Sequence, residues 1–265
     1  MRNTRLFLCV TFSILLVLIV ISTVWAERPI HETRSASPDG VVEIESLAGS
    51  IRIIGWDRNE VEVSGDLGDP KQELEIEGEG DRITIEIVLP HGRYQNIEGA
   101  DLEIKVPRGS RVEVESISAD IEASELSGRL ELETVSGNIT VNGGEPEELE
   151  LASVSGDIRV ESGGMLKEGS FETVSGNIMS STDFDSRGAF SFESVSGNLE
   201  LRVPAGANAF FEVSTFSGSI RNELGPEAER SNSILPSQEL EFTLGSGGAR
   251  ISLQAFSGKV KILKQ

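Results

Sequence analysis

A short pattern of polar and apolar residues recurs along the chain. It reads Ser/Thr, apolar, Ser, Gly, polar, aliphatic, as in Thr134–Ile139. From Ala119, which replaces the glycine in one copy, successive copies are 18, 19, 20, 21 and 21 residues apart. A fixed internal period near this length is typical of stacked repeats. The turn glycines of the copies are Gly49, Gly137, Gly156, Gly176, Gly197, Gly218 and Gly258.

The apolar positions keep a constant distance from the glycine. Around Gly137 they lie seven, five and two residues before it and two and four after it: Leu130, Leu132, Val135, Ile139 and Val141. The first two alternate as in a strand, the third breaks the phase, and the last two alternate again. Each unit therefore predicts a strand, a bend, a tight Ser-Gly turn and a second strand, with these five positions in the interior.

One such unit cannot bury its apolar edge, whereas stacked units can. The repeat therefore predicts an all-β fold, a parallel β-solenoid (β-helix) with rungs of about 18–21 residues, spaced about 4.8 Å apart. The 40 residues between Gly218 and Gly258 indicate two repeats with one copy of the phrase lost. An antiparallel sandwich or barrel is the alternative, because Leu74–Glu77 and Ile83–Ile87 resemble a local hairpin.

The N-terminus has the features of an export signal. Arg2 and Arg5 precede an uncharged run, Leu6–Val24, and Val24–Ala26 suits a signal peptidase. Residues 1–26 are thus predicted to be a signal peptide or, alternatively, a helical membrane anchor. Residues 27–38 read as a linker and 39–265 as the solenoid domain. The domain is expected to be exported: periplasmic, on the cell surface or secreted, and tethered to the cytoplasmic membrane if the N-terminal segment is retained.

Composition narrows the chemistry. Cys9 is the single cysteine, so the exported part has no disulfide, thiol nucleophile or cysteine metal site. The net charge of −21 disfavours nucleic acid and anionic lipid as partners, and membrane contact is expected only through residues 6–24 if they are retained. The two histidines, His31 and His91, show no catalytic-triad or metal-ligand spacing. The sequence predicts no cofactor.

Glutamates recur on the outward face of the first strand. The acidic ladder, interrupted by Ala152, comprises Glu115, Glu133, Glu172 and Glu193, and a second column comprises Glu113, Glu131 and Glu150. Like charges at rung spacing repel one another. Calcium could relieve this repulsion through oxygen ligands, although a solvated acidic face is the favoured explanation of the pattern.

Two further columns follow the turns. One contains Ser136, Ser155, Ser175, Ser196 and Ser217, and the other contains Asn138, Asp157, Asn177 and Asn198. Stacked amides hydrogen-bond to each other along such a column, which favours a structural role over a glycan-binding one. Near the C-terminus, residues 222–238 read as a protruding loop. Lys259, Lys261 and Lys264 are predicted to protect an open end of the stack against edge pairing.

The repeated Thr-Val-Ser-Gly-Asn-Ile phrase resembles the bacterial putative-adhesin family of β-repeat domains of unknown function. Gly49–Val61 is similar to the opening of that family and Leu102–Pro107 to its middle, so the resemblance spans residues 39–265. It implies an exported or membrane-associated β-repeat domain and brings no catalytic or binding residues.

The sequence therefore favours a non-enzymatic exported protein, an adhesin or an interaction scaffold of the cell envelope. Its partner would be a protein or glycan of the envelope or surface. The alternatives are an extracytoplasmic regulatory or sensory domain in envelope stress and a polysaccharide-active β-helix enzyme. Sparse aromatic residues on the outer face weigh against the enzyme.

Overall fold

The computed structural model describes residues 29–89, 98–230 and 237–265. Within these ranges the chain forms strands and short connections and no helix, and hence no helix that could cross a membrane. The predicted signal or anchor of residues 1–26 lies outside the described residues. The strands are β1 Pro29–Trp56, β2 Glu60–Asp66, β3 Glu73–Val88, β4 Ala100–Pro107, β5 Arg111–Ser124, β6 Arg129–Thr134, β7 Ile139–Asn142, β8 Glu148–Ser153, β9 Ile158–Thr173, β10 Ile178–Ser196, β11 Leu199–Val203, β12 Ala209–Asn222, β13 Glu229–Arg230, β14 Gln238–Leu244 and β15 Ala249–Lys264.

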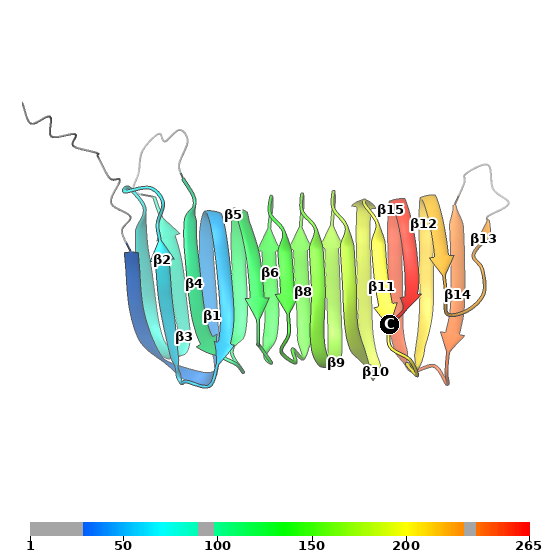
Figure 1. Ribbon diagram of the computed structural model, residues 1–265, viewed down its shortest axis with the longest axis horizontal. Helices are drawn as coiled ribbons and strands as arrows, with labels where there is room; N and C mark the ends of the chain where they lie inside the picture. The colour runs from blue at the N-terminus through cyan, green and yellow to red at the C-terminus, as the bar shows by residue number, and fades with distance from the viewer. Residues whose placement is uncertain (1–28, 90–97, 231–236) are drawn as a thin grey trace, which may run out of the picture.

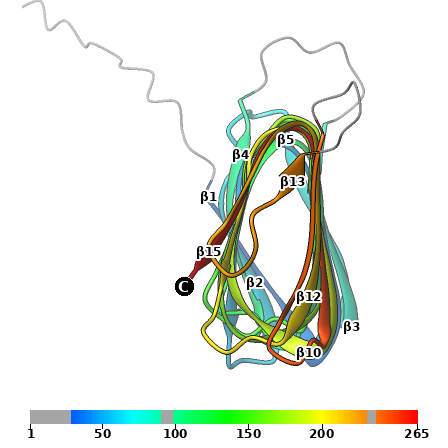
Figure 2. The same ribbon diagram turned by 90° about the vertical axis from the view of Figure 1, so that its right-hand side faces the viewer.

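All the described strands belong to one sheet that winds into a flattened coil (Figures 1 and 2). In the centre, β5, β6, β8, β9 and β10 pair in parallel, with equivalent repeat positions side by side. Leu130, for example, pairs with Leu149. The predicted all-β, parallel, stacked architecture is confirmed.

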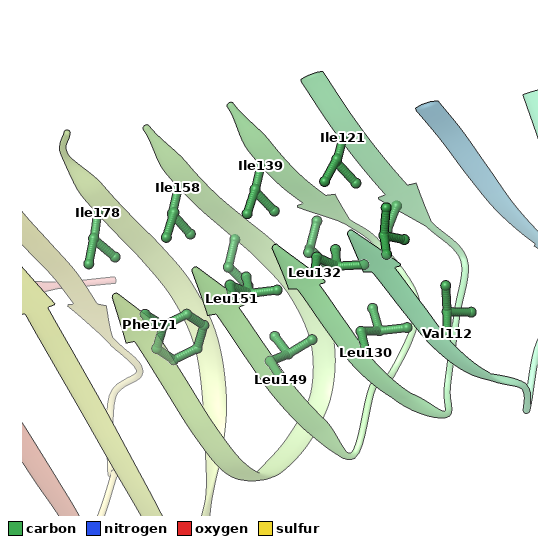
Figure 3. Close-up of a cluster of buried hydrophobic side chains, with 14 of the residues drawn as sticks. Val112, Ile121, Leu130, Leu132, Ile139, Leu149, Leu151, Ile158, Phe171 and Ile178 are labelled. Carbon is green, nitrogen blue, oxygen red and sulfur yellow. The ribbon is translucent and has the colours of Figure 1, made fainter. Parts of the chain in front are cut away.

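Four of the five predicted interior columns are buried. Around Gly137 these are Leu130, Leu132, Ile139 and Val141, each at most 2% exposed. The equivalent residues of neighbouring rungs lie in line with them (Figure 3). Aliphatic side chains stacked at rung spacing exclude water along the whole axis, and this burial stabilises the coil.

The glycine of the phrase is required by close approach between rungs. A Cβ added at Gly156 would overlap the carbonyl oxygen of Gly137, and one at Gly176 would overlap that of Gly156. The central glycines do not have positive φ; among the phrase glycines only Gly49 does, at 114°. A side chain would therefore push adjacent rungs apart, which explains why small residues recur here.

The C-terminal strand is not the end of the stack. β15 lies between β11 and β12, pairing in parallel with both (Figure 1). Gly258 is the register partner of Gly218, so the predicted missing repeat between them does not exist. The predicted end-protecting role of Lys259, Lys261 and Lys264 is also wrong, because their rung is internal. Beyond β12 lies β14, which pairs antiparallel with it, and the two-residue β13 pairs with the far side of β14.

The N-terminal strand is inserted in the same way. Residues 49–54 of β1 lie between β5 and β4, and residues 41–45 lie between β5 and β3. Residues 29–35, assigned to the linker from the sequence, pair antiparallel with β2. The predicted Leu74–Ile87 hairpin is instead one long strand, β3, which pairs in parallel with β1.

The loop predicted at residues 222–238 is partly described. Glu223–Ala228 forms no strand, whereas Glu229–Arg230 is β13 and pairs with the start of β14. Residues 231–236 lie outside the described residues.

Candidate interaction groove

A long groove follows the solenoid axis across most of its rungs. Its volume is about 990 Å³. Three columns of side chains line it, each drawn from equivalent positions of successive rungs. We call them the apolar ridge, the hydroxyl floor and the acidic ladder.

The apolar ridge is the fifth predicted column, and it points outward. It comprises Ile117, Val135, Val154, Val174, Val195, Phe256 and Phe216. These side chains are between 38% and 57% exposed, so their predicted place in the interior is wrong. Thr134 continues the inward phase of Leu130 and Leu132, and Val135, one residue later, necessarily faces out.

The hydroxyl floor consists of the Ser or Thr that opens the phrase in every copy except the one around Gly258, which opens with Ala255. Thr173 donates a hydrogen bond to the Gly156 carbonyl at 3.2 Å, and Ser153 donates to the Gly137 carbonyl at 3.1 Å. Thr134, Ser194 and Thr215 make the equivalent bond. Each of these five hydroxyls thus satisfies the carbonyl that approaches the neighbouring glycine, which explains why hydroxyl residues occupy this position in most rungs.

The acidic ladder forms the opposite wall. The register places Glu115 beside Glu133 and Glu172 beside Glu193, with Ala152 between the two pairs. Glu45 continues the ladder beside Glu115. Partial burial, followed by repulsion from Glu115 and Glu131, raises the pKa of Glu133. The wall therefore concentrates negative charge.

The second glutamate column, two residues earlier in each strand, is neutralised by arginines. Arg111 pairs with Glu113 and Glu131, and Arg129 pairs with Glu131, Glu148 and Glu150. By contrast, among the described residues no lysine or arginine forms an ion pair with Glu115, Glu133, Glu172 or Glu193. Glu172 and Glu193 each accept one hydrogen bond, from Ser170 and Ser191. Within the part of the chain that the structure describes, the charge on these four glutamates is thus uncompensated by ion pairs.

The C-terminal part of the groove is aromatic. The rings of Phe216 and Phe256 stack with centroids 4.8 Å apart and an interplanar angle of 9°. The insertion of β15 places Phe256 between Val195 and Phe216, because Ser194 pairs with Ala255 and Ala255 with Thr215. The inserted strand therefore makes the ridge continuous.

The asparagine column lies outside this groove and has a structural role, as predicted. Asn177 donates its backbone N–H and its side-chain amide to Asp157 Oδ1, and Asn198 donates both to Asn177 Oδ1. Asn138 makes the same pair of bonds to Asp120. The column ties successive turns together.

The structure does not bring the remaining candidates together. His31 pairs with Ser64 in the N-terminal part of the sheet, and His91 lies outside the described residues. In residues 29–89, 98–230 and 237–265 no group of three acidic, histidine or cysteine residues could hold a metal ion. Calcium binding by the acidic ladder stays a hypothesis. The apolar ridge was missed as a surface, although the phase set by the preceding Ser or Thr could have revealed it.

Stacked rungs with a lengthwise groove define this chain as a parallel β-solenoid repeat protein. Residues 76–263 match the Toastrack DUF4097 family, and the chain belongs to that family. The predicted relationship to β-repeat domains called putative adhesins is confirmed. No curated protein matches the chain.

Several solved structures are similar in fold. A putative adhesin from Bacteroides fragilis shares 10% identity with a TM-score of 0.52, covering 90% of this chain and 98% of its own. A putative cell adhesion protein from Clostridium sporogenes shares 11% identity with a TM-score of 0.40, covering 90% and 100%. A putative adhesin from Parabacteroides merdae shares 11% identity with a TM-score of 0.43, covering 89% and 96%.

Proposed function

We propose that this chain is an exported, non-enzymatic protein that acts as an adhesin-like interaction scaffold at the cell surface or in the periplasm. The groove carries the proposal, because the apolar ridge is half-exposed on successive rungs. Contiguous exposed apolar surface is typical of interaction sites. Stacked repeats hold such a surface at fixed spacing, as an extended binding face requires.

A binding comparison tests this role. The purified protein and the ridge variant Val135→Ser/Val154→Ser/Val174→Ser would be presented to cell-wall glycans, lipopolysaccharide, matrix proteins and isolated envelope fractions. We expect saturable binding to one of these classes, weakened at least about tenfold in the ridge variant. The three valines are half-exposed, so the variant should fold. Binding that is equal for both proteins would contradict the proposal.

Export is tested separately. A C-terminally tagged chain would be followed in the source cells by adding protease from outside. A chain on the cell surface should be cleaved at once, whereas a periplasmic chain should be cleaved only after the outermost permeability barrier is opened. Cytoplasmic fractionation of the tagged chain would contradict export. The mass of the recovered chain would tell whether residues 1–26 are removed.

A further inference from the structure

We infer that the groove binds a cationic amphipathic α-helix, about 20 residues long, supplied by a partner polypeptide. This inference rests on the proposed function and specifies its partner class. The helix would lie along the solenoid axis, with its apolar face on the ridge and its lysines or arginines on the acidic ladder.

The dimensions of the ridge suit a helix. It covers seven successive rungs from Ile117 to Phe216, about 29 Å at the spacing of hydrogen-bonded strands. A helix of about 20 residues is about 30 Å long, and its turns repeat every 5.4 Å, close to the rung spacing of about 4.8 Å. In an extended segment along the axis, side chains on one face repeat about every 6.6 Å. This repeat differs more from the rung spacing, so fewer of its side chains would align with successive rungs.

The apolar ridge and the acidic ladder require different side chains from a bound partner. The ridge offers aliphatic side chains along its length and a stacked aromatic pair, Phe256 and Phe216, at one end. The ladder offers carboxylates with no ion pair among the described residues. A helix with adjacent apolar and basic faces meets both needs, since its long basic side chains can lie over apolar surface while their charges reach the acids.

Charge also argues against a second copy of this chain as the occupant. The protein carries a net charge of −21, and a copy placed on the groove would bring further acid to a wall whose glutamates have no ion pair with a described lysine or arginine. Like charges brought together without counterions disfavour association. A cationic partner instead gains from the same field.

A designed peptide provides the probe. We would titrate the full-length protein with three repeats of the heptad Leu-Lys-Lys-Leu-Leu-Lys-Leu and record fluorescence anisotropy and peptide helicity. A peptide of the same length with strictly alternating Leu and Lys, which favours a strand, is the first control; its composition is nearly the same, 11 Leu and 10 Lys against 12 and 9. We expect saturable, helix-inducing binding of the heptad peptide, with about tenfold weaker binding of the alternating peptide.

Matched variants locate the site. Glu133→Gln/Glu172→Gln/Glu193→Gln removes three charges from the ladder. Glu73→Gln/Glu75→Gln/Glu77→Gln removes three exposed charges from β3, which does not line the groove at these positions. The ladder variant and the ridge variant should each weaken binding about tenfold, and the β3 variant less than about twofold.

Equal weakening by the ladder and β3 variants would show that net charge alone drives binding and would overturn the inference. Equal binding of the two peptides would overturn the helical occupant. If the heptad peptide fails but an envelope component binds in a ridge-dependent way, the proposed function stands and this inference fails. If no binding of any kind depends on the ridge, both fail.

Discussion

The centre and the ends of the solenoid are built from the same repeat but are connected differently. From β5 to β11 each rung follows its neighbour in the chain, and every pairing is parallel. At each end the terminal strand of the chain, β1 or β15, does not form the outermost rung but lies one rung further in. The parallel rung outside it pairs in turn with an antiparallel strand. Local sequence therefore determines the shape of a rung, whereas pairing between distant segments determines where a terminal rung lies.

This arrangement gives the ends a stability that depends on strands far away in sequence. An inserted terminal strand has neighbours on both sides, so it cannot fray as the last rung of a simple stack can. The outer rungs are held by antiparallel partners, which shorten the exposed strand edge. Four changes, from the largest expected effect to the smallest, test the comparison.

Deletion of residues 249–265 should have the largest effect. β15 buries Ile251, Leu253, Val260 and Ile262, so its loss should cost roughly 6 kcal/mol or more of burial. Because β15 is internal, we expect β11 and β12 to lose hydrogen-exchange protection while β6 and β8 keep theirs. If β15 were instead a terminal rung, its deletion would leave the hydrogen exchange of β12 unchanged. Unchanged exchange in β12 would therefore contradict the placement of β15 between β11 and β12.

Gly176→Ala should be the most damaging point change in the centre. The added methyl would overlap the Gly156 carbonyl, which is backbone and cannot rotate away. Overpacking of this kind should lower the free energy of unfolding by about 3 kcal/mol, measured in urea. Gly163→Ala is the control: its methyl would approach the Gly144 carbonyl at 3.3 Å, and it should cost less than about 1 kcal/mol. Equal losses would refute the close-approach explanation.

Removal of a hydroxyl from the floor should lower the free energy of unfolding in the centre but not toward the N-terminal end. Thr173→Val leaves the Gly156 carbonyl without its donor and should cost about 1–2 kcal/mol, whereas Thr173→Ser should cost less. Toward the N-terminal end, on β1 and on β5 where the centre begins, the hydroxyls of Ser46 and Ser116 are buried without a partner among the described residues. Ser116→Ala should therefore be neutral or slightly stabilising in urea unfolding. A loss as large as that of Thr173→Val would contradict this difference.

Replacement of Glu200 or of Glu133 by Gln should change the free energy of unfolding by small amounts of opposite sign. Burial raises the pKa of Glu200, but hydrogen bonds from Lys261 on the inserted strand and from Arg202 outweigh it, so the pKa is lowered overall. Glu200 then contributes stability above its unfolded pKa, which is lost as pH falls through the lowered value. Glu200→Gln should cost about 0.5 kcal/mol at pH 7, and the difference should fade in acid.

The contribution of Glu133 to stability depends on pH in the opposite direction. Its raised pKa means that the folded state binds more protons than the unfolded one, so its contribution to stability falls as pH rises through that range. Glu133→Gln should therefore stabilise the protein at pH 7 by about 0.3 kcal/mol, a small amount because the side chain is only slightly buried and solvent screens its charge. Urea unfolding at pH 7 and in acid measures both variants, and a destabilising Glu133→Gln would contradict the repulsive ladder.

Much of the rung could be predicted from the sequence, and the order of the rungs could not. Leu130, Leu132, Ile139 and Val141 were identified because strand alternation and a fixed offset coincide. Val135 was misplaced because apolar character alone does not give direction where the phase breaks; the inward position belongs to Thr134, whose hydroxyl finds a backbone acceptor. The insertion of β15 was invisible, since every rung carries the same offsets and any two can pair in register.

The same limitation applies to the groove. The acidic ladder was visible as a column of glutamates, but its lack of arginine partners depends on which rungs are neighbours. The continuity of the ridge through Phe256 depends on the insertion of β15 between β11 and β12. The spatial order of the rungs is thus the claim on which both the fold and the groove depend.

Disulfide cross-linking tests that order most directly. In a Cys9→Ser background, Ser191→Cys/Ser252→Cys joins register partners on β10 and β15, and Ser191→Cys/Glu212→Cys joins β10 to β12, which lies one rung beyond β15. Adjacent in-register residues suit disulfide geometry, whereas residues two rungs apart are about 9.6 Å from each other and do not. We predict rapid oxidation of the first pair alone. Oxidation of the second pair in preference to the first would show that the rungs follow chain order and would contradict the account.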